Sequence, residues 1–347
     1  MIKASYKKYV LEFKNASGTS RGILKTKETW FIILEENGKI GIGETGLFRG
    51  LSIDDVPNYE KKLEWVCNNI HLGLQKLVAE VFNFPSIQFG LEQAFLSLKS
   101  VNKFQLFPSE FTKGNQAISI NGLVWMGDKD FMKQQIQEKL KKGFSCIKMK
   151  IGAINFEEEI NLLKSIRKEF SAKEIELRVD ANGAFSPKEA LEKLKILSEL
   201  DIHSIEQPIK QGQIEEMALL CQKTPLPIAL DEELIGVFSY QQKKQLLETI
   251  QPQYIILKPS LIGGFTGSND WIDVAKSNQI NWWITSALES NIGLNAIAQF
   301  TYTLNNNLPQ GLGTGSLFTN NLDSPLEVKN GALHYNNSKK WNTNLIL

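Results

Sequence analysis

The chain has 347 residues, enough for one large barrel or for two domains, and its 42% hydrophobic and 22% charged residues are typical of a globular protein. Its 39 Lys and Arg against 38 Asp and Glu leave a net charge of +1 with no block of like charge, which argues against nucleic acid or a membrane surface as a partner. Three distant cysteines (Cys67, Cys146 and Cys221), an N-terminus unlike a secretory signal and the lack of a long apolar run predict a cytoplasmic protein.

Residues 1–113 are predicted to form an α+β module. Within residues 19–44, the alternating segments TWFIIL and KIGIGE flank a Glu-Asn-Gly turn, which is typical of a β-hairpin. Two helices are predicted after it, at about 55–82 and 90–101, the first from apolar residues at helical spacing. The segment FTKGNQ is interpreted as a linker, and the C-terminal tail, about 320–347, is expected to pack back on the module.

Residues 114–319 have a different pattern, in which short apolar strands alternate with amphipathic helices. The predicted strands are AISINGL, SCIKMKI, IELRVDA, HSIEQP, PIALDE, YIILKP, WWITSAL and QGLGTG. Such βα units predict an α/β fold, a TIM-like (β/α)7β barrel. An open, doubly wound sheet is the structural alternative, and it is disfavoured because no G-x-G-x-x-G follows an early strand.

Seven of these strands end in a polar residue. The positions lie 25 to 30 residues apart, about one βα unit each: Lys150, Asp180, Glu206, Asp231, Lys258, Ser286 and Thr314. A single polar strand end is usually a helix cap or a solvated residue. In a closed barrel, however, all these positions meet at the C-terminal mouth, where barrel enzymes carry out their chemistry. The regular spacing therefore predicts an active site at that mouth.

The three middle positions are carboxylates on consecutive strands, Asp180, Glu206 and Asp231. Three like charges brought together repel one another unless a cation lies among them. An all-oxygen site suits Mg²⁺, or Mn²⁺, better than zinc. His203 begins its strand rather than ending it and is expected to be a packed or capping side chain, so zinc is poorly supported.

Lysines flank these acids. Lys148 and Lys150 lie two residues apart in a predicted strand, so both side chains point the same way, and Lys258 lies on the other side of the carboxylates. A lysine that is poorly solvated or near other cations has a lowered pKa and can act as a base near neutral pH. Lysines that face a divalent cation across a cavity are suited to removing a proton next to a carboxylate and stabilising the enediolate.

This order of residues resembles the enolase superfamily: Lys-x-Lys, then Asp, Glu and Asp on successive strands, then Lys before Pro-Ser. Within it, the chain resembles the branch of muconate cycloisomerase, dipeptide epimerase and o-succinylbenzoate synthase. The segment GIGETGLFRGLS, residues 41–52, is similar to that superfamily's loop over the active site, so the N-terminal module would be its capping domain. The resemblance covers nearly the whole chain.

The resemblance implies a role for each matched residue. Lys150 is the expected catalytic acid and base, Lys148 is expected to stabilise the anion beside it, and Lys258 is expected to face the other side of the substrate. Whether Lys258 also moves a proton stays open. Asn182 and Glu232 are expected to support the metal ligands. Those expected ligands are Asp180, Glu206 and Asp231.

Other residues distinguish the members of this branch. Dipeptide epimerases resemble one another in an Asp-x-Asp at the eighth strand, whereas this chain has QGLGTGSLF there, and Glu289 is the only acid between Trp283 and Asp323. Residues 284–299, ITSALESNIGLNAIAQ, followed by GLGTG, are similar to o-succinylbenzoate synthase. This similarity implies Mg²⁺-dependent dehydration of 2-succinyl-6-hydroxy-2,4-cyclohexadiene-1-carboxylate to o-succinylbenzoate in menaquinone biosynthesis, through an enediolate.

The expected substrate contacts lie around the mouth. Hydroxyl and backbone N–H groups are expected to receive a carboxylate, and the loops at 20–21 and 48–52 are expected to cover the site and exclude water. Arg21 and Arg49 are candidates to pair with the succinyl carboxylate, against the alternative of solvated loop arginines, and Trp125 is expected to pack. The candidate contacts are Ser286, Ser290, Gly311, Gly313, Arg21, Phe48 and Ser52.

Two other functions stay open. An N-acylamino acid racemase or a dipeptide epimerase would use Lys150 and Lys258 as two bases on opposite faces of an enediolate. A barrel kept as a ligand-binding or structural protein would need none of the six charged positions, all of which are present. The expected partner is a small-molecule carboxylate, and the sequence indicates no oligomeric state.

Overall fold

The N-terminal module is built on an antiparallel sheet. The computed structural model describes residues 1–19, 22–125, 127–344 and 346. Strands β1 (Lys3–Thr19), β2 (Gly22–Glu36) and β3 (Lys39–Glu44) pair in that order. β2 and β3 form the expected hairpin, because Glu36 pairs with Lys39 across Asn37 and Gly38, and both turn residues have the positive φ that a two-residue turn requires.

The helices of this module differ from the prediction. In place of one helix at 55–82 the chain forms α1 (Tyr59–Asn68), a short 3₁₀ turn η1 (Ile70–Leu72) and α2 (Leu74–Glu80). The continuous helix fails because Gly73 adopts φ 78°, outside the helical region. Helix α3 (Pro85–Lys99) then lies directly on β3, where a Cβ at Gly43 would come within 1.9 Å of the Gly90 carbonyl oxygen.

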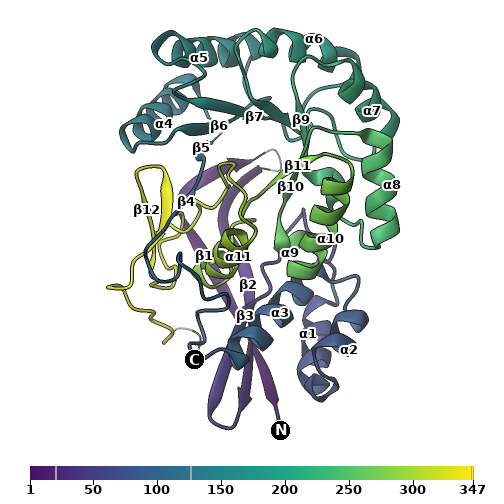
Figure 1. Cartoon of the computed structure of the whole chain (residues 1–347), viewed down its shortest axis with the longest axis vertical. Coiled ribbons are helices and arrows are strands. Elements are labelled where there is room, and N and C mark those ends of the chain that lie inside the picture. The colour runs from purple at the N-terminus through teal and green to yellow at the C-terminus, as the bar shows by residue number, and fades with distance from the viewer. Residues whose placement is uncertain (20–21, 126, 345, 347) are drawn as a thin grey trace.

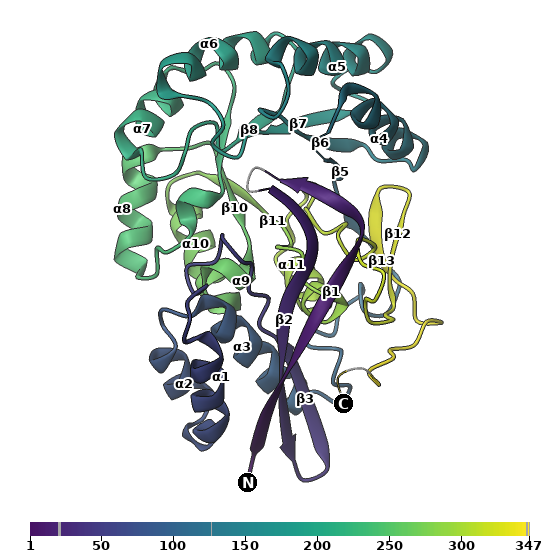
Figure 2. The same ribbon diagram turned by 180° about the vertical axis from the view of Figure 1, so that it is seen from behind.

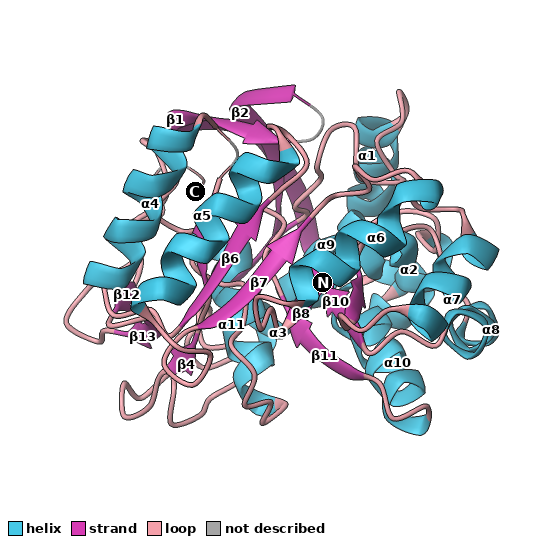
Figure 3. Ribbon diagram, turned by 90° about the horizontal axis from the view of Figure 1, so that it is seen from above, coloured by secondary structure: helices cyan, strands magenta, loops and turns pink. Residues whose placement is uncertain are grey.

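Seven parallel strands curl into a barrel, and Figures 1 and 3 show helices along its outside. The order of the strands in the sheet is their order in the chain, as right-handed βα units predict. The strands are β5 (Gly122–Val124), β6 (Cys146–Lys150), β7 (Glu176–Asp180), β8 (Ser204–Glu206), β9 (Ile228–Leu230), β10 (Tyr254–Leu257) and β11 (Asn281–Ile284). The helices are α4 (Lys129–Lys141), α5 (Phe156–Glu169), α6 (Pro187–Ser198), α7 (Ile214–Lys223), α8 (Tyr240–Ile250), α9 (Pro259–Ile262), α10 (Gly264–Ser277) and α11 (Asn291–Thr303).

The predicted eighth strand closes the barrel with only two residues. Gln310 forms a parallel bridge with Ile120, just before β5, and Gly311 forms one with Thr285, just after β11. Both edges of the seven-stranded sheet are therefore joined, which contradicts the open-sheet alternative and confirms the barrel. The predicted first strand, AISINGL, is split, because β4 (Ile118–Ser119) leaves the barrel and pairs with β13 (Ala332–Tyr335), the partner of β12 (Leu326–Lys329).

The capping sheet and the C-terminal segment contact each other and the barrel. Figure 2 shows β1 and β2 as two long curved strands that run from the N-terminal end of the molecule toward the barrel. Phe13 on β1 packs edge-on against Phe318, and buried Leu11 clusters with Leu288. Trp341 stacks on Phe104. The domain boundaries at 113 and 319 stay predictions. No helix within the described ranges is long and apolar enough to cross a membrane.

Candidate active site

The register of three neighbouring strands brings the first site residues together. Lys150 on β6 lies opposite Asp180 on β7, and Asp180 lies opposite Glu206 on β8. Lys148 points to the same side of β6 as Lys150, since side chains two apart in a strand share a face. Asp231 follows β9 and Lys258 follows β10, so the expected charged residues all lie at the carboxyl ends of the barrel strands.

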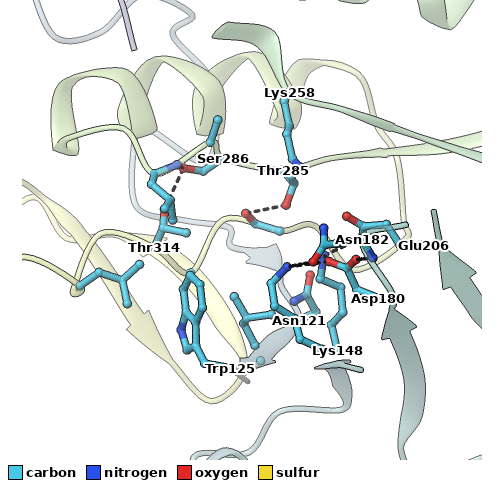
Figure 4. A pocket seen from close by; sticks show the side chains of 18 of the residues that line it. Asn121, Trp125, Lys148, Asp180, Asn182, Glu206, Lys258, Thr285, Ser286 and Thr314 are labelled. Atoms are coloured by element: carbon cyan, nitrogen blue, oxygen red, sulfur yellow. Dashed lines mark hydrogen bonds and ion pairs between the residues drawn. The ribbon is translucent and has the colours of Figure 1, made fainter. Parts of the chain in front are cut away.

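Ammonium and carboxylate groups interleave at this mouth (Figure 4). The Lys148 Nζ lies 3.0 Å from Asp180 Oδ2 and 2.5 Å from Glu206 Oε2. The Lys150 Nζ also lies 3.0 Å from Asp180 Oδ2, and Lys258 pairs with Asp231. Each acid side chain is almost fully buried, so these ion pairs are little screened by solvent.

Burial and attraction oppose each other in setting the pKa values. Burial alone would lower the pKa of Lys148, but attraction to Asp180 and Glu206 outweighs it and raises that pKa above its ordinary value. The pKa of Lys258 is raised in the same way by Asp231, against the effect of burial. The expectation that these two lysines have lowered pKa values is therefore wrong, because each ammonium lies directly on a carboxylate.

The carboxylates show the complementary effects. Burial raises the pKa of Asp180, but Lys148 and Lys150 outweigh burial and hold that pKa well below its usual range. Burial raises the pKa of Glu206, and repulsion from Asp180 adds to the rise. Negative charge is thus least well compensated at Glu206, whose Oε1 is buried without a hydrogen-bond partner among the described residues.

A divalent cation fits the donor set at this mouth. Asp180, Glu206 and Asp231 offer only carboxylate oxygens, which suit Mg²⁺ or Mn²⁺, and the Glu206 Oε1 is an unsatisfied buried acceptor within the described chain. No group of three or more Asp, Glu, His or Cys side chains in the described ranges is already gathered as metal ligands. Asp180 and Glu206 form ion pairs with Lys148, and Asp231 forms one with Lys258. A bound cation would therefore compete with these ammonium groups for the carboxylate oxygens.

Two amide side chains form hydrogen bonds with the charged residues of the site and with their backbone. Asn182, at φ 44°, accepts a hydrogen bond from Lys150 Nζ at 2.5 Å and donates from Nδ2 to Glu232 Oε1 at 3.0 Å. The second amide, Gln207, is not among the site residues that the sequence predicts. Its Oε1 accepts from the Asp231 backbone N–H at 3.2 Å, and its Nε2 donates to Glu233. The signal for Gln207 was its place directly after a strand-ending acid.

A cavity of about 160 Å³ opens beside the lysines and is bounded by both the barrel and the capping module. Of the expected substrate contacts, Ser286, Gly311, Gly313 and Phe48 line it, as does Trp125. The sequence does not single out several other lining positions, among them Asn121, Thr285, Leu288 and Leu317. The remaining lining residues that bear on the site are Leu51, Asn121, Lys148, Lys150, Asp180, Asn182, Glu206, Glu232, Lys258, Thr285, Leu288, Thr314 and Leu317.

Three other expected contacts do not line this cavity as the structure describes it. Ser290 caps α11 and donates from Oγ to Glu44 Oε2 at 2.5 Å. The Ser52 Oγ accepts from the Phe48 backbone N–H at 2.9 Å and so shapes the loop that carries Phe48. Arg49 forms ion pairs with Glu28 and Asp55. Arg21, with the loop at 20–21, lies outside the described residues.

Comparison with known proteins agrees with this geometry. A family model described as "Enolase C-terminal domain-like" matches residues 131–339. The chain is 46% identical to the o-succinylbenzoate synthase of Desulfotalea psychrophila, over 96% of this chain and 98% of that protein. The fold is similar to the crystal structure of MenC from Desulfotalea psychrophila LSv54, with a TM-score of 0.86 and 43% identity over 96% of this chain and 99% of that one.

A more distant structure shares the fold alone. The crystal structure of the dipeptide epimerase from Enterococcus faecalis V583, complexed with Mg and the dipeptide L-Leu-L-Tyr, has a TM-score of 0.79 and 21% identity, with 96% of each chain covered. The resemblance expected from the strand-end residues is confirmed by the family model and by the relative from Desulfotalea psychrophila. The chain belongs to the enolase superfamily, and within it to the family of o-succinylbenzoate synthases.

Proposed function

We propose that the protein is an o-succinylbenzoate synthase, a hydro-lyase that converts 2-succinyl-6-hydroxy-2,4-cyclohexadiene-1-carboxylate to o-succinylbenzoate in the menaquinone pathway. The 46% identity over 96% of the chain supports this reaction. The single structural observation that carries the chemistry is the arrangement of Lys148 and Lys150 on one side of the cavity with Lys258 also lining it. We expect the enzyme to act in the cytoplasm on this small dicarboxylate.

Lys150 is the proposed acid and base. Its Nζ is held by Asp180 at 3.0 Å and by the Asn182 Oδ1 at 2.5 Å, and its side chain is 12% exposed, so it is positioned at the cavity rather than in solvent. As a neutral amine it removes the proton α to the ring carboxylate, and the electron pair moves into that carboxylate as an enediolate. The pair then returns, the carbon–oxygen bond breaks, and Lys150 returns its proton to the leaving hydroxyl. Water departs and the ring becomes aromatic.

Asp180, Glu206 and Asp231 would hold Mg²⁺, or Mn²⁺, which when bound supplies positive charge to stabilise the enediolate. Asn182 and Glu232 would orient this group of ligands, because Asn182 links the Asp180 and Glu232 carboxylates by hydrogen bonds. Mg in the dipeptide epimerase structure, which shares the fold, supports the choice of metal.

Lys148 and Lys258 would act as fixed positive charges. The raised pKa of each favours the protonated form near neutral pH, which suits stabilising an anion rather than accepting a proton. This supports an electrostatic role for Lys258 in a reaction that needs one base. The second candidate, an N-acylamino acid racemase, is favoured only by the presence of Lys150 and Lys258 at the same cavity and requires Lys258 to exchange protons.

One pair of assays separates these functions. The protein is incubated with Mg²⁺ and the cyclohexadiene substrate while the aromatic product is followed by absorbance. In parallel, an N-succinyl amino acid is incubated in heavy water and its α-proton is followed by NMR. Aromatic product is the expected result. Exchange without aromatic product would favour the racemase, and neither reaction would favour a binding protein.

A further inference from the structure

Glu289 is a fully buried carboxylate that the proposed mechanism does not use. It lies between β11 and α11, and each of its oxygens accepts a hydrogen bond from a serine. The Ser260 Oγ donates to Oε1 at 2.5 Å, and the Ser286 Oγ donates to Oε2 at 2.6 Å. Burial raises the pKa of this carboxyl, and the two serine hydrogen bonds are among the interactions that oppose the rise. One carboxylate thus ties the segment after β10 to the segment after β11.

Both serines lead to the wall of the cavity. Ser260 lies in the first turn of α9, two residues after Lys258, and the Lys258 carbonyl caps the same turn by accepting from Leu261 N–H at 2.8 Å. Ser286 lines the cavity, and Thr314 Oγ1 donates to its Oγ at 2.9 Å. Glu289 is therefore connected to two strand ends at the cavity and, through Ser286, to Thr314 at a third.

These hydrogen bonds also use the hydroxyl protons. The Ser286 proton is directed at Glu289, and the Thr314 proton is directed at Ser286. A hydroxyl has one proton to donate, so neither side chain can donate to a substrate carboxylate while this chain of bonds is intact. In this arrangement Ser286 shapes the wall of the cavity, and its expected role as a direct donor to the substrate stays a prediction.

Glu289 interacts electrostatically with a buried lysine of the capping module. Lys27 on β2 is 6% exposed, and its Nζ is buried without a hydrogen-bond partner in the described part of the chain. Burial lowers the pKa of Lys27, and attraction from Glu44 and Glu289 opposes that effect. The loop after β3 is close as well, because a Cβ at Gly46 would lie 2.9 Å from the Ser260 Cβ. Glu289 therefore lies where the cap and the barrel meet.

We infer that Glu289 is a positioning residue of this active site: through Ser260 it fixes the backbone that carries Lys258, and through Ser286 it fixes Thr314 at the cavity wall. It touches none of the reacting atoms. The activity readout of this inference rests on the proposed function. Misplacing a reacting group by about 1 Å can cost a hundredfold in rate, so loss of these anchors is expected to lower kcat more than it changes KM.

The test compares Glu289→Ala and Glu289→Gln with Glu92→Gln as a matched control. Glu92 is also a buried carboxylate, 5% exposed, and it joins the module to the barrel by accepting from the Phe265 N–H at 2.5 Å. It does not line the cavity as the structure describes it. Glu289→Ala is expected to lower kcat about tenfold or more, whereas Glu92→Gln is expected to lower Tm and leave kcat within about twofold. Equal kcat for wild type and a folded Glu289→Ala would overturn the inference.

A double-mutant cycle tests whether Glu289 acts through the serines. In the Ser260→Ala/Ser286→Ala background, Glu289→Ala is expected to reduce kcat by less than about twofold further, because its partners are already gone. A full additional loss would contradict the inference. If Glu289→Ala does not fold, Glu289→Gln takes its place in the cycle, since it keeps the volume and only exchanges one acceptor for a donor.

A crystal structure of the same variant separates this inference from the proposed function. If wild type does not convert the cyclohexadiene substrate, the proposed function fails, and the positions of side chains alone decide the inference. Displacement of the Ser286 and Thr314 hydroxyls in Glu289→Ala, with Glu92→Gln unchanged at the cavity, supports it. Unchanged positions of Ser286, Thr314 and Lys258 would overturn it.

Discussion

Lys148→Met tests how the charges of the mouth are balanced. Lys148 is the cation shared by Asp180 and Glu206, and its side chain is 11% exposed. Asp180 keeps Lys150 at 3.0 Å after the substitution. Glu206 loses the one ion pair that the described residues give it, and its Oε1 has no hydrogen-bond partner among them. The variant therefore leaves a buried carboxylate uncompensated.

The expected cost follows from that loss. Removing one partner of a buried ion pair costs about 3–5 kcal/mol. A chain of 347 residues has an unfolding entropy of about 0.7 kcal/mol/K, so Tm is expected to fall by about 4–7 °C in the absence of divalent cations. Lys148 also competes with a cation for the carboxylate oxygens, so Mg²⁺ is expected to raise the Tm of the variant by more than it raises that of wild type.

The assay is thermal unfolding of both proteins in EDTA and at several Mg²⁺ concentrations. Glu206→Gln provides the control background, because a neutral side chain there no longer needs the cation, and Lys148→Met is expected to cost less than half as much in it. A Tm in EDTA within about 1 °C of wild type would refute the reasoning about charge balance. An equal response to Mg²⁺ in both proteins would refute the competition between Lys148 and the cation for these carboxylates.

Two further predictions concern stability. Gly311→Ala is expected to lower the free energy of unfolding by about 3 kcal/mol or more, because the new Cβ would lie 1.5 Å from the Thr285 Oγ1 where the barrel closes. The control Gly50→Ala, at φ 73° and with nothing within 4 Å of the new Cβ, is expected to lower it by only about 1–2 kcal/mol. Equal losses for the two variants in urea denaturation would contradict this prediction. Burial raises the pKa of Asp54 to about 6, so as the pH rises from 4 to 7 the unfolded chain loses this proton before the folded protein does. The free energy of unfolding of wild type is therefore expected to fall over this range by up to about 3 kcal/mol relative to that of Asp54→Asn. A difference between the two proteins that does not change with pH, measured by urea denaturation, would contradict that assignment.

The sequence predicted the barrel and the meeting of its strand-end residues because both follow from local periodicity. A βα unit of near-constant length places Lys150, Asp180 and Glu206 at equivalent positions, and parallel register then makes them neighbours. The same spacing predicts the eighth strand. In the structure this strand is reduced to two bridges, from Gln310 to Ile120 and from Gly311 to Thr285. The spacing of residues along the chain carries no information about these contacts.

Other features depend on contacts that no local pattern reveals. β1 was missed because most of its side chains are exposed or half-buried and its pairing with β2 shifts between Glu12 and Ser17, so it has no clean alternation. The helix at 55–82 was predicted as continuous because periodicity does not report the positive φ of Gly73. The sequence groups Ser290 with Ser286, but Ser290 lies at the start of α11, where its hydroxyl donates a hydrogen bond to Glu44.

The raised pKa values of Lys148 and Lys258 also depend on contacts that the sequence pattern does not reveal. The sequence placed lysines beside carboxylates, but whether burial or attraction dominates depends on which atoms touch. Contacts of Lys148 with two carboxylates and of Lys258 with one make attraction dominant. The role of Glu289 was equally invisible, since it depends on two serines that lie 29 and 3 residues away in the chain.

The central claim is that Lys150 moves the proton. Its most direct test is the rate of aromatic product formation from the cyclohexadiene substrate at saturating Mg²⁺, for wild type and for Lys150→Ala shown to be folded. Loss of a general acid–base group is expected to lower this rate by about 10²–10⁴-fold, while Mg²⁺ still raises Tm because the three carboxylates are retained. A folded Lys150→Ala protein with a rate within about tenfold of wild type would contradict the claim.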